Sequence, residues 1–195
     1  MEYRFRAMHH DEFLAHINFL YNKLNDFLID KNLKIDYVVP LLRSGAVPAV
    51  YLANKLNIVK FAPFQVKHIK YNNNKETIEI LFNPLNELEI KKSEPCFLVI
   101  EGTHSTGKSA ELCIDNILSK YPIAKILYVC IAKEYNSKNF DNKVIFESSA
   151  YQIGENLSLE QCKILNIDPN CPIYPWESLE DQLTHPDDLE NNIFF

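Results

Sequence analysis

Glycine is scarce in this chain of 195 residues, which contains only four. Two of them, Gly102 and Gly107, lie in one short stretch in the middle of the chain. Long apolar runs are lacking too, and none approaches the roughly 20 residues that a membrane-spanning helix needs. Residues 1–10 contain no apolar core of a signal peptide. The sequence therefore predicts neither a membrane segment nor a secretory leader.

An excess of positive charge is also absent, because the formal net charge is −6. This negative net charge argues against a nucleic-acid-binding surface, although a local group of hydrogen-bond donors can still hold a phosphate on an acidic protein. No CxxC pair occurs, and an odd, scattered set of cysteines is typical of a reducing compartment. We expect a cytoplasmic protein with small-molecule partners, with no nucleic acid and no membrane. The five cysteines are Cys96, Cys113, Cys130, Cys162 and Cys171.

The apolar patterning alternates between strands and helices. Helical spacing predicts helices over 11–33, 46–56 and 110–120. Apolar or alternating runs predict strands over 36–40, 59–66, 77–82, 96–100, 126–132 and 144–146. Such alternation is typical of an α/β domain with a mostly parallel central sheet, and the length suits a single domain over 1–195.

Residues 96–109 form the stretch with the clearest chemical signal. An apolar run ends at Glu101 and is followed by small and hydroxylated residues before the next helix. The backbone amides of such a loop and the helix dipole favour a bound anion. The residues Gly102-x-x-x-x-Gly107-Lys108-Ser109 also match the P-loop pattern of nucleotide triphosphatases. A turn without any ligand is the third interpretation.

A second strand–turn–helix unit lies earlier, where Arg43, Ser44 and Gly45 follow a short apolar strand. An arginine at a helix start can grip phosphate with its fork of donors, although it can also be a plain surface residue. In parallel sheets, ligands bind beyond the carboxyl ends of strands. The carboxyl ends of three predicted strands are expected to carry Arg43, the 101–109 segment and Lys133.

Several motifs, in order along the chain, resemble those of type I phosphoribosyltransferases. The 39–48 segment is similar to their pyrophosphate loop, and 105–109 to their loop for 5-phosphoribosyl 1-pyrophosphate (PRPP). Residues 67–80 resemble their flexible loop between two strands. Ile131-Ala132-Lys133 and Pro175-Trp176-Glu177 are closest to the enzymes that use 6-oxopurines, the xanthine–guanine and hypoxanthine–guanine types. The resemblance covers about 36–177.

The resemblance implies a transferase that joins Mg²⁺-bound PRPP to a 6-oxopurine, giving a nucleoside monophosphate and pyrophosphate. It implies a core over about 34–147, a C-terminal hood over about 148–195, and a dimer or tetramer. It also implies that the Leu42–Arg43 peptide bond is cis. The implied site residues are Glu101 and Ser105 for catalysis, with Glu101 also reaching Mg²⁺ through the substrate; Thr103, His104, Ser105, Thr106, Gly107, Lys108 and Ser109 for the 5′-phosphate; Arg43, Ser44 and Gly45 for pyrophosphate; Lys133 and Tyr151 for the base; and Lys67, Lys70 and Tyr71 in the flexible loop.

The chain departs from the family at two positions. Gly102 stands where the family has a second acid, and Ser105 stands where the 6-oxopurine enzymes have an aspartate. One alternative is therefore a sensor that binds PRPP or a nucleotide without turnover, and the other is a P-loop kinase. If the missing acid is what limits catalysis, Gly102→Asp should raise turnover, provided that the backbone at residue 102 does not take a positive φ.

Overall fold

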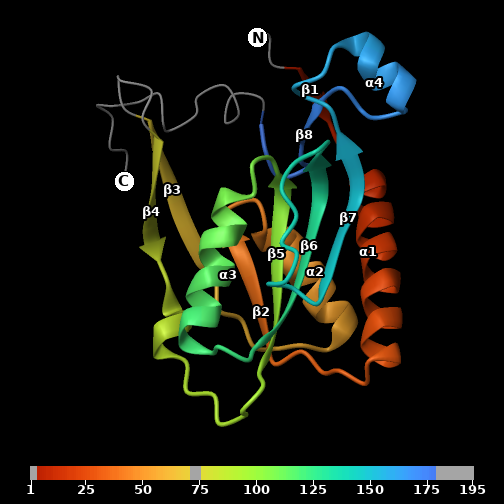
Figure 1. Ribbon diagram of the computed structural model, residues 1–195. Helices are drawn as coiled ribbons and strands as arrows, with labels where there is room; N and C mark the ends of the chain where they lie inside the picture. The colour runs from red at the N-terminus through yellow and green to blue at the C-terminus, as the bar shows by residue number, and fades with distance from the viewer. Residues whose placement is uncertain (1–3, 71–75, 179–195) are drawn as a thin grey trace.

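The computed structural model describes residues 4–70 and 76–178. Its centre is a six-stranded sheet in the order β4-β3-β2-β5-β6-β7 (Figure 1). All neighbouring strands are parallel except β4, which pairs antiparallel with β3. The strands are β2 (Tyr37–Leu42), β3 (Phe64–Lys70), β4 (Glu76–Phe82), β5 (Cys96–His104), β6 (Lys125–Glu134) and β7 (Phe146–Ile153).

Helices cover both faces of this sheet. One face packs against α1 (His10–Asp30) and α2 (Ala46–Leu56), and the other against α3 (Lys108–Lys120), as Figure 1 shows. A short 3₁₀ helix, η1 (Pro84–Glu87), leads from β4 towards β5. The buried residues of α1 recur at helical spacing, so one stripe of the helix faces the sheet. Those residues are Phe13, Ile17, Leu20 and Leu24.

Both ends of the described chain build a small second layer, which we call the hood. It consists of β1 (Phe5–Ala7), α4 (Leu159–Leu165) and β8 (Cys171–Ile173), and β1 pairs parallel with β8. Arg4 donates to the carbonyl oxygens of Gly154, Glu155 and Leu157. Arg6 forms ion pairs with Glu12 and Asp168. These contacts fasten the first strand to a segment far along the sequence.

The predicted fold class is confirmed: the sheet is mostly parallel and helices flank it. The last strand differs from the prediction, because β7 runs over Phe146–Ile153 and not over 144–146. Its residues Glu147, Ser148 and Ser149 are half-buried on an edge strand, so it lacks the apolar run that marks an interior strand. The expected boundary between 147 and 148 therefore falls inside β7, and the core sheet extends to Ile153.

The segment expected to be a flexible loop is largely strand up to residue 70. β3 begins later than predicted and includes Lys67 and Lys70, and β4 starts at Glu76. Tyr71 lies outside the described residues. Within the described part of the chain, no helix is both long enough and apolar enough to cross a membrane.

Candidate phosphate-binding site

The candidate site lies where β2, β5 and β6 end. The three strands are neighbours and parallel, so their carboxyl ends meet at one edge of the sheet (Figure 1). Residues 43–45 follow β2 and lead into α2, and residues 105–107 follow β5 and lead into α3. The sequence predicted both units, and the topology places them side by side.

The first turn is packed tightly against the adjacent strand. Gly45 is the N-cap of α2, and its amide donates to the carbonyl oxygen of Leu41 at 2.9 Å. A Cβ atom at this position would lie 2.2 Å from the carbonyl oxygen of Ile100, so only glycine fits. The Leu42–Arg43 peptide bond is cis, as the resemblance implies. Arg43 itself is exposed and available to a ligand.

Gly102 lies on β5, just ahead of the second turn, and is packed against the first turn. A Cβ atom at this position would lie 2.7 Å from Cβ of Ser44 and 3.1 Å from the carbonyl oxygen of Ser44. Its φ is not positive, since Gly107 alone among the four glycines takes that conformation. Space, and not backbone strain, is therefore what excludes a side chain. The expectation that Gly102→Asp would be tolerated is wrong, because the new side chain would displace the Ser44 turn.

The second turn is short and open to solvent. Gly107, the N-cap of α3, has φ +76°, and no side chain caps the helix. Ser105 and Thr106 are exposed beside it. At the start of α3, the Ser109 hydroxyl lies 2.9 Å from Nε2 of His68 on β3. Thr106 Oγ1 accepts from the Lys108 amide at 3.5 Å, and the dipole at the N-terminus of α3 favours an anion.

This geometry does not form the wide loop of a nucleotide triphosphatase. Thr103 and His104 still pair with Ala132 and Lys133 of β6, so β5 continues past Gly102. The turn proper contains only residues 105–107 before α3 begins at Lys108. Gly102 therefore marks the contact of β5 with the Ser44 turn and not the start of a phosphate-wrapping loop.

Two residues predicted to bind the 5′-phosphate direct their side chains elsewhere. The Thr103 hydroxyl is 2.9 Å from the hydroxyl of Tyr174, next to the hood. The His104 ring is fully buried, and its Nδ1 lies 2.8 Å from the hydroxyl of Tyr128. Only the backbones of these two residues remain for a phosphate. Burial lowers the pKa of His104 to about 4, so the ring is neutral at neutral pH.

Glu101, the predicted ribose contact, is 9% exposed. The Tyr128 hydroxyl donates to its Oε2 at 2.5 Å. Burial raises the pKa of Glu101 to about 7, against a usual value of 4.5. No group of three acid, histidine or cysteine side chains converges on a metal position anywhere in residues 4–70 and 76–178. Glu101 is the one acid of β5, so any Mg²⁺ here would depend mainly on oxygen ligands of the substrate.

The two predicted base contacts lie in different surroundings. Lys133 is buried, and its ammonium donates to Oδ1 of Asn139 at 2.5 Å and pairs with Glu147. Tyr151 packs against α1, where its ring stacks on His16 with centroids 4.6 Å apart. Its hydroxyl is buried without a hydrogen-bond partner, and burial raises its pKa. The base-contact roles of both residues stay predictions.

Sequence reasoning missed the two tyrosines that contact the loop. Tyr174 is buried and stacks on Trp176 with centroids 5.0 Å apart and an interplanar angle of 3°. The Pro-Trp-acid motif pointed to this segment but not to the Thr103 contact. Tyr128 lies inside an apolar run, so nothing in the sequence distinguishes it from plain core.

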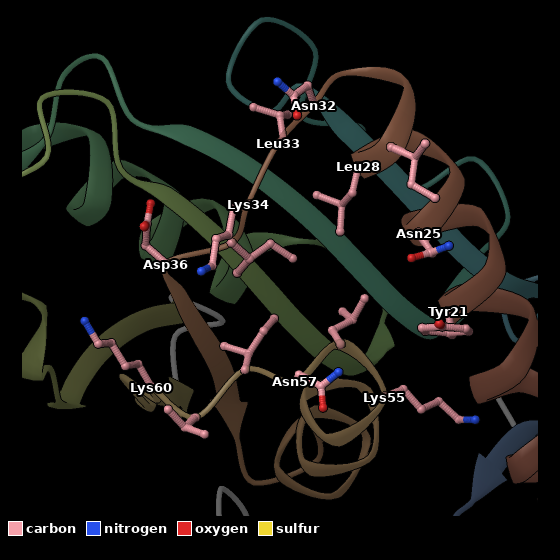
Figure 2. Close-up of a pocket in the computed structure, with 15 residues that line it drawn as sticks. Tyr21, Asn25, Leu28, Asn32, Leu33, Lys34, Asp36, Lys55, Asn57 and Lys60 are labelled. Atoms are coloured by element: carbon pink, nitrogen blue, oxygen red, sulfur yellow. The ribbon is translucent and has the colours of Figure 1, made fainter.

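A separate cavity of about 730 Å³ lies between the C-terminal ends of α1 and α2, close to the residues that lead into β2 (Figure 2). It is therefore at the end of the sheet opposite to the two turns. Its labelled side chains include Tyr21, Lys34, Lys55 and Lys60. None of the predicted site residues lines it. The cavity is therefore distinct from the two turns.

No family model matches the sequence, and no curated protein matches it either. Solved structures do match. A purine phosphoribosyltransferase from Pyrococcus horikoshii Ot3 is 17% identical, with a TM-score of 0.63 over 90% of this chain and 95% of that one. Xanthine-guanine-hypoxanthine phosphoribosyltransferase of Helicobacter pylori is 15% identical, with a TM-score of 0.60 over 93% of this chain and 99% of that one.

A hypothetical protein from Neisseria gonorrhoeae with bound ppGpp is 14% identical, with a TM-score of 0.70 over 98% of this chain and 99% of that one. At these identities the likeness concerns the fold. The chain has the type I phosphoribosyltransferase fold over nearly its whole length.

Proposed function

We propose that this protein is a phosphoribosyltransferase that binds Mg²⁺-bound PRPP and transfers its phosphoribosyl group to a 6-oxopurine. The observation that carries the proposal is the contact of Ser44, in the first turn, with Gly102 of β5, just ahead of the second turn. Two turns that each begin a helix without a side-chain cap lie next to each other. A ligand with phosphates at both ends of a ribose can span such a pair.

Each turn takes one end of the ligand. Arg43, with the amides of Ser44 and Gly45, holds pyrophosphate, because a guanidinium offers charge-assisted donors to phosphate oxygens. The amides and hydroxyls of residues 105–109 hold the 5′-phosphate at the N-terminus of α3. Glu101, at the edge between them, contacts a ribose hydroxyl. As pyrophosphate leaves, positive charge develops on the ribose carbon, and the protein acts by positioning and by electrostatic stabilisation.

Lys133 is proposed to read the 6-oxo group of the base, after release from Glu147 and Asn139. The Tyr174–Trp176 stack lies next to the loop through Thr103, so it is a better candidate than Tyr151 for the wall of the base pocket. We further propose a cytoplasmic dimer or tetramer, with PRPP supplying the pyrophosphate oxygens that hold Mg²⁺.

The second candidate function is a sensor that binds PRPP or a nucleotide without turnover. The observation that favours it is the absence of space for a second acid at position 102, together with the Tyr128 hydrogen bond that holds Glu101. The neighbour from Neisseria gonorrhoeae, which has ppGpp bound, is compatible with nucleotide binding on this fold.

Calorimetric titration with Mg²⁺-bound PRPP tests the binding site. Arg43→Ala should weaken binding about ten- to a hundredfold, since hydrogen bonds to charged groups contribute roughly 1.5–3 kcal/mol. Lys163→Ala is the matched control, because it removes an exposed cation of α4. Equal affinities of both variants and the wild type would contradict the assignment of Arg43.

Pyrophosphate release, measured on the same preparation with guanine, hypoxanthine or xanthine, then separates the two candidate functions. The transferase releases pyrophosphate with at least one of these bases. A protein that binds PRPP but is silent with all three is the sensor.

A further inference from the structure

We propose that His104 and Tyr128 are positioning residues that couple occupancy of the phosphate turn to the orientation of the Glu101 carboxylate. The inference rests on the proposed function, because it concerns the same turn. Its basis is a continuous buried chain: Nδ1 of His104 lies 2.8 Å from the Tyr128 hydroxyl, and that hydroxyl lies 2.5 Å from Oε2 of Glu101. His104 and Tyr128 are both fully buried.

The protonation state of Glu101 sets the direction of this chain. With Glu101 ionised, the Tyr128 hydroxyl donates its one proton to the carboxylate, and its oxygen accepts from Nδ1 of His104. Nε2 of His104 is buried at the other end of the ring. The three side chains thus form one hydrogen-bonded unit.

At its other end, the chain touches the turn that would receive the phosphate. A Cβ atom at Gly107 would lie 2.8 Å from both Cε1 and Nε2 of His104, so the turn rests directly on the ring. Phe140 packs against both rings of the chain, with its ring centroid 5.4 Å from that of His104 and 5.0 Å from that of Tyr128. Because the ring is fully buried and the turn lies directly against it, we expect a shift of the turn to move the ring.

The carboxylate end has few other restraints. Among the described residues, Tyr128 makes the one side-chain hydrogen bond to Glu101, and Nδ1 of His104 lies 3.9 Å from the same carboxylate oxygen, Oε2. Movement of the His104 ring therefore reaches Glu101 through Tyr128. A phosphate in the turn would set the carboxylate that contacts the ribose.

Nuclear magnetic resonance with inorganic phosphate as the probe tests the coupling in the wild type. At alkaline pH, where Glu101 is ionised, added phosphate should shift the side-chain carboxyl ¹³C resonance of Glu101 with the same midpoint as the amides of residues 105–109. If the amides shift and the Glu101 carboxyl does not, the coupling is refuted while the phosphate site stands. If nothing shifts, the proposed function fails as well.

Tyr128→Phe tests the role of the hydroxyl, because it keeps the ring packing with Phe140. The preference for ribose 5-phosphate over inorganic phosphate should fall on the order of tenfold, since a charged hydrogen bond orients Glu101. Affinity for inorganic phosphate should stay within about twofold of the wild type, because the turn itself is intact.

Tyr121→Phe is the matched control for that variant. It also removes a hydrogen-bonded tyrosine hydroxyl, which donates to the Leu88 carbonyl oxygen at 2.7 Å, but it leaves Glu101 untouched. Its preference should remain that of the wild type. An equal loss of preference in both variants would show a general structural effect and overturn the coupling. If Tyr128→Phe does not fold, the phosphate titration of the wild type decides the matter alone.

Discussion

The N-termini of α3 and α4 are built in opposite ways. α4, in the hood, begins with a capping box: Ser158 accepts from the Gln161 amide, and the Gln161 side chain accepts from the Ser158 amide. α3, at the candidate site, has Gly107 as its N-cap, and this residue has no side chain that could cap the helix. The hood helix is closed by a capping box, whereas the site helix has none, and its Lys108 amide donates to Thr106 Oγ1 at a long 3.5 Å. An uncapped end lowers stability and is useful where a ligand completes it.

The same contrast applies to the glycines. Gly45 and Gly102 lie against backbone or a Cβ atom of the adjacent turn or strand, so nothing nearby can move aside cheaply. Gly154, beside the hood, faces the side-chain ends of Cys162 and Leu157, at 2.8 and 3.0 Å from a Cβ position. Side chains can rearrange where backbone cannot. The site edge is therefore expected to be much less tolerant of substitution than the hood.

The largest effect is expected for Gly45→Ala. The added methyl would overlap the Ile100 carbonyl oxygen, and overpacking of this kind costs about 3 kcal/mol. Urea denaturation should show this loss, and titration should show that PRPP binding is lost with it. Gly154→Ala is the control, with a cost of about 1 kcal/mol and unchanged PRPP affinity. Equal costs for the two variants would remove the contrast between site edge and hood.

The second prediction concerns the pH dependence of the free energy of unfolding, to which the buried Glu101 contributes. Glu101 has a folded-state pKa of about 7, above its usual 4.5, so the native state favours its protonated form. The stability that this group contributes is present below pH 4.5 and is lost as the pH rises through 7. The loss at alkaline pH is about 3 kcal/mol.

Glu101→Gln should remove this loss while the Tyr128 hydroxyl keeps an acceptor. Chemical denaturation at a series of pH values should show the variant gaining stability over the wild type as the pH rises from 5 to 8. His104 acts in the opposite sense, since its pKa is lowered to about 4 and its contribution is lost as the pH falls through that value. The difference between the two proteins is therefore the informative quantity. If the difference in the free energy of unfolding between the variant and the wild type is constant with pH, the raised pKa of Glu101 is contradicted.

The sequence predicted the fold and both turns because those signals are local. An apolar strand, a small-residue turn and an amphipathic helix lie within one short stretch in each unit, and the alternation gives a parallel sheet. The hood was not predictable in the same way. β1 and β8 are three residues each, and they form a sheet only with each other across most of the chain.

The details of the site depend on contacts that no local pattern encodes. Whether Gly102 has space for a side chain depends on Ser44, which is brought to it by the pairing of β2 with β5. Lys133 meets Glu147 because the intervening loop returns to place β7 beside β6. Tyr128 lies in an apolar run, and its polar role comes from the hydrogen bond that its hydroxyl donates to Glu101. Residue types could be read from the sequence, but their partners could not.

The smallest effect is expected for Ser158→Ala in the hood. The variant loses the bond from the Gln161 amide to Ser158 Oγ, at 3.2 Å, and loss of an N-cap costs about 1 kcal/mol. Denaturation should show this small loss, and hydrogen exchange should locate it in α4. PRPP affinity should not change, because α4 has no part in either turn. Ser93→Ala, at an exposed serine ahead of β5, should change neither stability nor PRPP affinity.

Weaker PRPP binding by Ser158→Ala alone would show that the hood reaches the site, with the Tyr174–Thr103 contact as the connecting route. The contrast between a self-capped hood and an open site edge would then have to be replaced by one coupled unit.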